Sequence, residues 1–264
     1  MGCITLLSDF GLQDASVASV KGIIMQQSPT AKVVDITHMV EPRNLQQAAY
    51  LLAASYRHFP AGTCHILLCD IFYEKTPRLL LHQRDGQFFL APDNGVLSLA
   101  FGDNPGNVWR CFELQAEESF SEWVRKTVNI AMRLSNSSAQ ALGFEASEMK
   151  NAPVHCLAKI EANAIEGQVI HIDRYGNVVV NITQQEFDQV GTGRPFRIEF
   201  MREEPITELG GHYRSVRHGD KLCRFNSIGY LEIAVNRGGA AELFSMKMKS
   251  EKDFLYNIIK ISFE

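Results

Sequence analysis

The sequence predicts an α/β protein with an N-terminal, mostly parallel sheet covered by helices and a C-terminal all-β, barrel-like domain. In the first half, short apolar runs alternate with segments whose apolar residues recur at helical spacing. That rhythm is typical of a parallel sheet. From about residue 160, short alternating strands separated by glycines indicate a small β-barrel or sandwich. We therefore expect domains at 1–155 and 164–264.

The N-terminal elements follow in a regular order. Buried strands are predicted for "CITLLSDFG", "AKVVDITH" and "GTCHILLCD", where apolar runs end in polar residues. Helices are predicted for 15–27 and for "NLQQAAYLLAASYRHF", each followed by a proline, and for 121–134. The stretch "RLLLHQRDGQFFLAPDNGVLSLAF" is interpreted as hairpin-forming strands, with its Asp-Gly and Asn-Gly pairs as turns.

Three carboxylates, Asp9, Asp35 and Asp70, follow strand-like runs. In open α/β sheets, ligands gather beyond the carboxyl ends of the strands. We therefore expect these three side chains near one rim of the sheet. Asp9 alone is equally consistent with a capping or turn residue. Asp35 and His38 have the side-chain types of metal ligands, but no third ligand stands at a telling spacing, so a hydrogen-bonded loop is the preferred interpretation.

Composition excludes several classes of function. The chain has 264 residues, of which 45% are hydrophobic and 21% charged, with a net charge of −4. A nucleic-acid-binding protein needs a basic face, and no Lys/Arg run supplies one. No apolar run is long enough for a membrane span, and the N-terminus lacks the features of a signal peptide, so we expect a cytoplasmic protein. Neither a Gly-x-Gly-x-x-Gly loop nor a nucleophile elbow is present.

The stretch "IDRYGNVVVNI" combines a carboxylate, an aromatic ring and an amide in Asp173, Tyr175 and Asn177. These groups suit a nucleoside, because the ring can stack on a base and the amide can pair with its edge. A polar hairpin turn built on Tyr-Gly-Asn explains the same residues. From the residues alone, the turn is the preferred interpretation and the nucleoside site is the alternative.

Six motifs in order give a resemblance to one family: "ITLLSDFG", "QDASVASVKGII", "VVDITH", "APDNG", "IDRYGN" and "LEIAVN". Together they resemble the S-adenosylmethionine (SAM) hydroxide adenosyltransferases, which are related to the fluorinases and chlorinases. The resemblance covers about residues 3–245.

The resemblance implies a homotrimer in which SAM or adenosine binds between the N-terminal domain of one subunit and the C-terminal domain of its neighbour. It implies no metal and no cofactor besides SAM itself, as substrate or ligand. The residues that it assigns to binding are Asp9 for the ribose, Asp14, Ser16 and Asp173 for the methionine end, Tyr175, Asn177 and Tyr213 for the adenine, and Ser227 and Asn236 for further contacts.

The implied reaction is displacement at the ribose C5′ by water, giving adenosine and L-methionine, with an Asp, Arg and His set in the family hydrolases. This sequence departs from that set. The family pattern Asp-Pro-Gly-x-Gly-Thr-x-Arg stands here as "DIFYEKTP", which keeps Asp70 but has Pro77 at the Arg position. Arg78 is one place further, and in an extended segment it would point to the opposite face.

The family histidine is also replaced. Its motif aligns with "SEWV", so Ser121 takes the histidine position, and Glu122 and Trp123 are expected to fill space beside the nucleophile. Arg43 stands where relatives usually carry a large aromatic or apolar residue. Asp70 and Glu74 would repel a halide, so halogenation is not expected.

Three hypotheses follow for the function. The first is a divergent SAM hydrolase in which Asp70, Arg78 and Glu122 are the candidate catalytic residues. The second is a catalytically silent SAM- or adenosine-binding protein, because two of the three catalytic residues are lost. The third is an enzyme of the same fold that uses another nucleophile or another adenosyl substrate.

Overall fold

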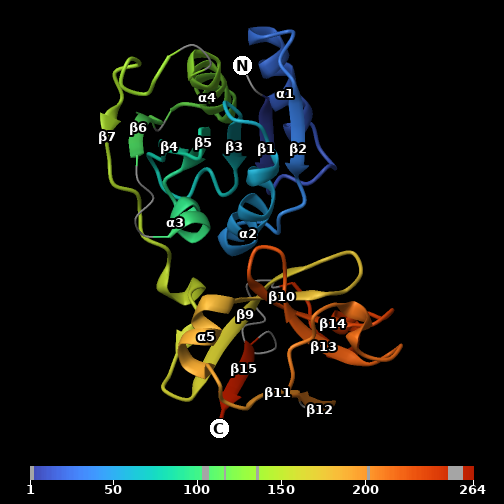
Figure 1. Cartoon of the computed structure of the whole chain (residues 1–264). Coiled ribbons are helices and arrows are strands. Elements are labelled where there is room, and N and C mark those ends of the chain that lie inside the picture. The colour runs from blue at the N-terminus through green and yellow to red at the C-terminus, as the bar shows by residue number, and fades with distance from the viewer. Residues whose placement is uncertain (1–2, 103–106, 116, 135–136, 201–202, 249–257) are drawn as a thin grey trace. The chain divides into compact units, whose positions relative to one another are not determined.

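The computed structural model describes residues 3–102, 107–115, 117–134, 137–200, 203–248 and 258–264 (Figure 1). The chain divides into two compact units, Met1–Ala152 and Pro153–Glu264. The first is a mixed sheet with helices and the second a nearly closed antiparallel sheet, so the predicted fold class is confirmed. No helix among the described residues is long and apolar enough to cross a membrane.

The N-terminal unit is built on one seven-stranded sheet with the order β2-β1-β3-β5-β4-β6-β7. Its strands are β1 (Ile4–Ser8), β2 (Val33–Thr37), β3 (Cys64–Leu68), β4 (Arg78–Arg84), β5 (Gln87–Pro92), β6 (Asn107–Glu113) and β7 (Glu145–Ala146). β1 runs parallel to β2 and β3, and β3 runs parallel to β5. The β4–β5 hairpin, which turns at Asp85 and Gly86 as predicted, begins the antiparallel side.

Helices cover both faces of this sheet. They are α1 (Ser16–Gln27), α2 (Leu45–Ser55), α3 (Val96–Phe101) and α4 (Phe120–Leu134), with a 3-10 turn, η1 (Tyr56–His58), after α2. Within β1, Leu6 belongs to the apolar cluster under α1 and α4, whereas Leu7 belongs to the cluster under α2 and α3. Burial on both faces explains why the central strands are continuous apolar runs.

Two sequence expectations for this unit are wrong. The Asn94-Gly95 pair does not turn between strands but leads into the helix α3. The strand β2 is not buried, because it lies at the edge of the sheet and Val34 is 41% exposed. An apolar run does not by itself distinguish a central strand from an edge strand.

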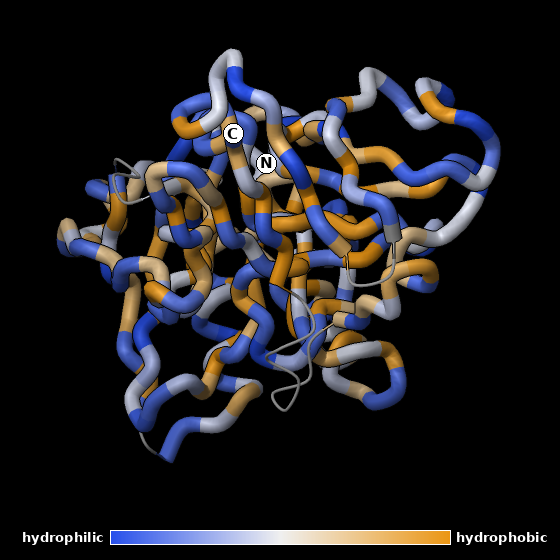
Figure 2. The backbone as a smooth tube through the Cα atoms, turned by 90° about the horizontal axis from the view of Figure 1, so that it is seen from below, coloured by the Kyte–Doolittle hydropathy of each residue, from blue (hydrophilic) through white to orange (hydrophobic). Residues whose placement is uncertain are grey.

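The C-terminal unit is an antiparallel sheet with the order β12-β11-β15-β9-β10-β14-β13 and β8 beside β9. Its strands are β8 (Lys159–Ile160), β9 (Ala164–Ile172), β10 (Val178–Thr183), β11 (Phe196–Phe200), β12 (Glu203–Ile206), β13 (Lys221–Phe225), β14 (Tyr230–Val235) and β15 (Ile258–Phe263). Its helices are η2 (Val154–Cys156), α5 (Gln184–Gly191), η3 (Tyr213–Ser215) and α6 (Ala240–Leu243). A bridge between Leu209 and Cys223 nearly closes the sheet. The apolar core of this unit is formed largely by strand residues such as Val180, Ile233 and Ile261. Figure 2 colours the backbone by hydropathy, with hydrophobic residues in orange.

A buried histidine, His65, lies in the middle of the N-terminal sheet. Its Nδ1 is 2.7 Å from Thr5 Oγ1, and its Nε2 is 2.5 Å from Gln87 Oε1. The Gln87 oxygen can only accept, so Nε2 carries the proton and Nδ1 accepts from the threonine hydroxyl. Burial is the main cause that lowers the pKa of His65, and it also lowers the pKa of His82. Burial therefore favours the neutral form of both rings.

We predict that the free energy of unfolding falls as the pH drops below about 6.5, the usual histidine pKa. Below this pH the histidines bind protons in the unfolded chain but not in the folded chain. The free energy of unfolding then falls by at most about 1.4 kcal/mol per pH unit for each histidine. Urea unfolding between pH 8 and pH 5 measures this slope. The His65→Gln variant should show a flatter slope, and the same change at the exposed His58 should not. An unchanged slope in His65→Gln would contradict the prediction.

Candidate functional site

Asp9 follows β1 and lies at the carboxyl end of the parallel strands. Its Oδ2 accepts two main-chain hydrogen bonds, from the Arg43 N–H at 3.0 Å and from the Asp70 N–H at 3.1 Å. The three residues come from the loops after β1, β2 and β3, so one carboxylate oxygen joins three loops. The other oxygen, Oδ1, accepts no hydrogen bond from a described residue and remains available to a ligand.

Both donors to Asp9 have left-handed backbones. The φ angle is 62° at Arg43 and 45° at Asp70. A non-glycine residue in this region costs roughly 1–2 kcal/mol, and such residues cluster at functional sites. The hydrogen bonds to Asp9 offset this cost. Asn94 adds support, because its Nδ2 donates to the carbonyls of Cys69 at 3.0 Å and Asp70 at 3.3 Å.

The electrostatics at Asp70 favour a proton-accepting role. Burial raises the pKa of the Asp70 carboxyl, the neighbouring Asp9 raises it further, and the positive charge of Arg43 lowers it. A half-buried carboxylate with a raised pKa is a stronger base than an exposed one, and it is a common form of general base. Of the three candidate catalytic residues, Asp70 is the one found beside Asp9.

Asp14 and Ser16 lie at the start of α1. The Asp14 Oδ1 accepts from the Ser16 N–H at 2.8 Å, and this hydrogen bond is the main cause that lowers the pKa of Asp14. These two of the three residues predicted for the methionine end are therefore joined by a hydrogen bond, with Asp14 exposed and Ser16 partly buried.

Arg78 is not brought to Asp70. Its guanidinium forms an ion pair with the fully buried Asp93, which also accepts the Lys150 N–H at 2.7 Å. The Arg78 N–H donates to the Tyr73 hydroxyl at 3.2 Å. The structure therefore does not support the expected catalytic placement of Arg78.

Lys150 contacts two further residues of the segment "DIFYEKTP", which departs from the family pattern. Its Nζ lies 3.0 Å from Glu74 Oε2 and 4.4 Å from the centre of the Tyr73 ring. Glu74 is therefore an ion-pair partner, and hydrogen bonds and the charge of Lys150 lower its pKa against the effect of its own desolvation.

Glu122 and Trp123 make contacts that stabilise the fold. The Glu122 Oε2 accepts from the Ser119 N–H at 2.6 Å and from the Ser119 hydroxyl at 3.1 Å, which caps the exposed start of α4. Trp123 is fully buried against Phe112, so the expectation that it fills space beside the nucleophile is wrong. Nothing on α4 places the Glu122 carboxylate with Asp70.

Asp35 does not join the rim either. It lies inside β2, where its carboxylate pairs with Lys21 at 2.6 Å and with His38 Nε2 at 3.2 Å. The expectation of three carboxylates at one rim is therefore wrong for Asp35. Within the described part of the chain, no three His, Cys, Asp or Glu side chains form a group that could hold a metal ion.

In the C-terminal unit, the turn after β9 is organised by Asp173. Its Oδ1 accepts from the N–H groups of Tyr175 at 2.8 Å and Asn177 at 2.9 Å, and its Oδ2 accepts from the Asn177 Nδ2 at 2.8 Å. An ionised carboxylate can only accept hydrogen bonds, so the Asn177 side chain must turn its Nδ2 group toward Asp173. The Asn177 Oδ1 then remains as an oriented acceptor.

This turn borders a pocket of about 560 Å³. Its lining consists of Asp173, Tyr175, Asn177, Tyr213, Val235, Arg237 and Gly238. Tyr175 is 81% exposed, while the Tyr213 hydroxyl donates to the buried Glu232 at 2.7 Å. Arg224 lies over the Tyr213 ring at 5.0 Å. Burial and Glu232 raise the pKa of Tyr213 to about 12, so its phenol stays neutral and its ring is fixed.

Two predicted contacts lie outside this pocket, and one lining residue was missed. Ser227 lies in the turn before β14, at the opposite end of a six-residue strand from the pocket, which is about 20 Å. Asn236 holds the loop after η3, since its Nδ2 donates to the Val216 carbonyl at 2.9 Å. Arg237 was missed, although the Gly-Gly pair after it signals a tight turn.

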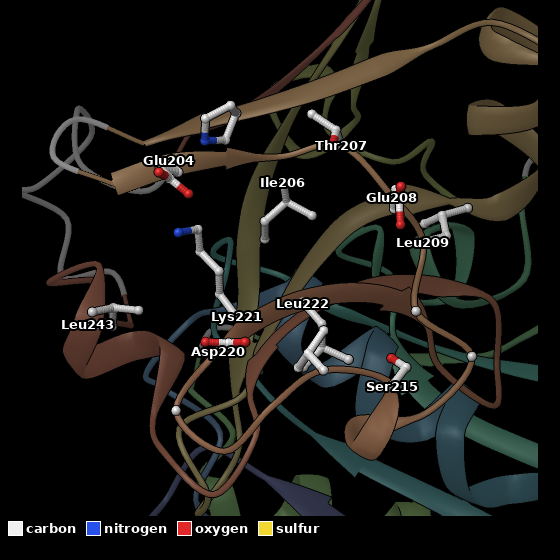
Figure 3. A pocket seen from close by; sticks show the side chains of 15 residues that line it. Glu204, Ile206, Thr207, Glu208, Leu209, Ser215, Asp220, Lys221, Leu222 and Leu243 are labelled. Atoms are coloured by element: carbon white, nitrogen blue, oxygen red, sulfur yellow. The ribbon is translucent and has the colours of Figure 1, made fainter.

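A second pocket, of about 550 Å³, lies between β12 and β13 (Figure 3). Glu204, Glu208 and Asp220 bring carboxylates to it, and Lys221 extends into it. It contains no residue of the predicted binding set. We therefore place the candidate site at the Asp9 rim and the Tyr175 pocket, each within its own unit.

The comparisons with known proteins agree on one family. The model of the SAM hydroxide adenosyltransferase N-terminal domain matches residues 4–140, and that of the C-terminal domain matches residues 167–252. A protein of Thermus thermophilus named (R)-S-adenosyl-L-methionine hydrolase is 29% identical over 92% of this chain and 96% of its own. A fluorinase of an Actinoplanes species is 23% identical over 92% of this chain and 94% of its own. The crystal structure of an uncharacterized conserved protein from Thermotoga maritima has a TM-score of 0.74 and 26% identity, covering 98% of this chain and 99% of that one.

Gly176 allows the turn at the Tyr175 pocket to form. Its φ is +77°, and an added Cβ would lie 2.8 Å from the Gly239 Cα. We predict that Gly176→Ala lowers the unfolding free energy by about 1–2 kcal/mol for its backbone and about 1–3 kcal/mol more for the clash. Gly229→Ala is a matched control, with φ +82° and open space around its Cβ. Urea unfolding of both variants measures the difference, and equal losses would contradict the predicted clash.

Proposed function

This chain belongs to the SAM hydroxide adenosyltransferase family, and from that premise we propose that it converts SAM and water to adenosine and L-methionine. The observation that carries the proposal is the arrangement at Asp9. One of its oxygens is held by the Arg43 and Asp70 N–H groups, the other is open, and Asp70 has a raised pKa beside it.

The open oxygen of Asp9 is suited to a ribose. A carboxylate oxygen has two lone pairs, so Oδ1 can accept from both the 2′ and the 3′ hydroxyl groups. The main-chain hydrogen bonds to Oδ2 prevent the carboxylate from rotating. Ribose binding at Asp9 would place the C5′ carbon near Asp70, which shares the same anchor.

The Tyr175 pocket is suited to an adenine. Tyr175 and Tyr213 supply aromatic rings for stacking, and the oriented Asn177 Oδ1 can accept from the exocyclic amine of the base. Arg237 adds a positive charge to this pocket. That charge complements the carboxylate of a methionine or another anionic group.

The proposed reaction is a substitution at C5′. The oxygen of a water molecule forms a bond to C5′ while the C5′–S bond breaks, and its electron pair goes to sulfur. Methionine leaves as a neutral thioether, so the leaving group needs no acid. The proton of the water goes to the Asp70 carboxylate, which acts as general base, and the in-line geometry comes from the anchored ribose.

We also propose that the protein is a homotrimer with each site completed by a neighbouring subunit. Three large apolar side chains are exposed in the loops that follow β1, β2 and β3. They are Leu12 at 67%, Met39 at 63% and Phe72 at 56%. Exposed apolar groups around a polar site are a common feature of an interface surface.

A second candidate function is a SAM- or adenosine-binding protein without turnover. The observation that favours it is the engagement of two candidate catalytic groups elsewhere. Arg78 is paired with Asp93, and Glu122 caps α4. Asp70 then has neither of the other two candidate catalytic residues beside it, while Asp9, Asp173 and Asn177 keep ordered side chains.

We predict that purified protein incubated with SAM forms adenosine and methionine in equal amounts, above a control without protein. The Asp70→Asn variant should lower the rate by about 10²–10⁴, because the base is lost. Asparagine tolerates the left-handed backbone at this position. The rate should also fall as the pH drops through the raised pKa of Asp70. Mass spectrometry of both products is the measurement. SAM that is bound but stays intact would favour the second candidate.

We predict that Asp9→Ala and Tyr175→Ala each weaken SAM binding, and that mixing the two variants restores part of it. In a ring of three, random exchange of subunits makes about a quarter of the shared sites unmodified. Isothermal titration calorimetry before and after exchange is the measurement, with Asp188→Ala as the exposed control. No recovery, or a monomer in analytical ultracentrifugation, would contradict a site shared between subunits.

A further inference from the structure

The buried side chain of His38 connects the strands β1 and β2 directly beside Asp9. Its Nδ1 lies 2.7 Å from the Oγ of Ser8, which is the last residue of β1. Its Nε2 lies 3.2 Å from the Oδ1 of Asp35 on β2, close enough for an electrostatic contact but not aligned as a hydrogen bond. The ring therefore has a hydroxyl on one side and a carboxylate on the other, and it is only 4% exposed.

The proton on the His38 ring can be assigned from these two neighbours. An ionised carboxylate can only accept a proton's hydrogen bond, so the charge of Asp35 favours a proton on Nε2. The Nδ1 of the neutral ring then accepts from the Ser8 hydroxyl. On its other side, Asp35 contacts Lys21, whose Nζ is 2.6 Å from Oδ2 and favours the ionised carboxylate. The contacts thus run from a surface lysine to the residue before Asp9.

His38 also holds the chain on the other side of Asp9. The N–H of Gly11, two residues after Asp9, donates to the His38 carbonyl at 2.7 Å. The N–H of Val40 donates to the Ser8 carbonyl at 3.4 Å, so the same two loops are joined once more. The main chain that carries Asp9 is therefore bound to the loop after β2 both before and after this residue.

A serine, a histidine and an aspartate in contact are also the parts of a hydrolytic triad, but the burial excludes that function here. Ser8 has an exposed fraction of 0%, so its hydroxyl cannot attack a substrate. The base of such a triad must also pass a proton to the leaving group, and the His38 ring is buried with both nitrogens facing protein groups. These side chains are therefore suited to hold a position and not to react.

We propose that His38 is a positioning residue that directs the Asp9 carboxylate toward the two hydroxyl groups of the ribose. This inference rests on the proposed function, because it assumes ribose binding at Asp9. The N–H groups of Arg43 and Asp70 hold the end of the Asp9 side chain, and His38 holds the main chain from which that side chain extends. Without the ring, the open oxygen of Asp9 no longer has a fixed position. The loss falls on ribose recognition and spares adenine stacking, which involves residues of the other unit.

The chain contains a matched control for the contact between Ser8 and His38. Thr5 lies on the same strand, and its hydroxyl is 2.7 Å from the Nδ1 of His65, so the two contacts have the same chemistry and the same length. Thr5, His65 and Ser8 are all fully buried. Thr5→Val and Ser8→Ala therefore each remove a buried hydroxyl from a histidine, and only Ser8 is next to Asp9. Urea unfolding gives the stability of each variant.

The first test measures the anchor of Asp9 without a ligand. Hydrogen exchange, followed by NMR, reports on the two main-chain N–H groups that donate to Asp9. In His38→Ala and Ser8→Ala, exchange at both groups should be about tenfold faster than in Thr5→Val, the effect of one net hydrogen bond. His38→Asn should restore part of the protection, because its amide can take the place of Nδ1. Equal exchange rates in Ser8→Ala and Thr5→Val would overturn the inference.

The second test measures ribose recognition by isothermal titration calorimetry. Adenosine and 2′,3′-dideoxyadenosine differ only in the hydroxyl groups that Asp9 is proposed to bind, so the ratio of their dissociation constants isolates this contact. The preference for adenosine should fall by about tenfold in Ser8→Ala and His38→Ala and stay at the wild-type value in Thr5→Val. Adding His38→Ala to Asp9→Ala should cause no further loss, because both changes remove the same interaction.

The outcomes separate this inference from the proposed function. A wild-type preference for adenosine that is retained in full by Ser8→Ala and His38→Ala would overturn the role of His38 and leave the ribose site in place. If the wild type does not distinguish the two nucleosides, the ribose site and the proposed function fail. The exchange rates then still decide whether His38 holds Asp9.

Discussion

The N-terminal site depends on one constraint. A single oxygen of Asp9 accepts hydrogen bonds from two main-chain N–H groups, those of Arg43 and Asp70. It connects the loop after β1 to the loops after β2 and β3, at the rim of a sheet whose central strands are buried on both faces. The two donors have left-handed backbones that are unfavourable in isolation. The same contact therefore fixes the direction of the free Asp9 oxygen, the position of Asp70 and the start of the Arg43 side chain.

The fold class was predictable because two kinds of strand leave different patterns in a sequence. A strand buried on both faces is a continuous apolar run, whereas a strand of a barrel alternates apolar and polar residues. β1 and β3 are continuous apolar runs, and β10 and β14 are short strands flanked by glycine turns. The errors arise where one pattern serves two structures. Asn94-Gly95 suits a hairpin turn and also the start of a helix, and only packing under α3 decides. Similarly, the apolar residues of β2 do not reveal that its outer edge has no partner strand among the described residues.

The positions of the candidate binding residues were easier to predict from sequence than the surroundings of the candidate catalytic residues. Asp9 and Asp173 directly follow strands and Asn177 directly precedes one, so their positions follow from the elements themselves. The partner of Arg78 is Asp93, which lies fifteen residues away, directly after β5, and no local pattern indicates it. For Glu122 a local signal did exist, because Ser119-x-x-Glu122 is the capping-box pattern at a helix start. Trp123 likewise belongs to the apolar stripe of α4 with Thr127, Ile130 and Leu134.

Under the proposed function, recognition and chemistry fall to different carboxylates, and the hydrogen bonds that each carboxylate already accepts explain the difference. The Asp173 carboxylate already accepts three hydrogen bonds, so its main effect is to orient Asn177 for a base. Asp70 is different, because burial and the neighbouring Asp9 raise the pKa of its carboxyl, which suits a general base. Under the proposed function, changes in the segment after Asp70 act on the reaction, since the residues of the Tyr175 pocket belong to the other unit. Under the proposed function, a member of this family can lose its usual arginine and histidine positions and still hold SAM. Whether it then turns SAM over depends on the charge balance at one carboxylate.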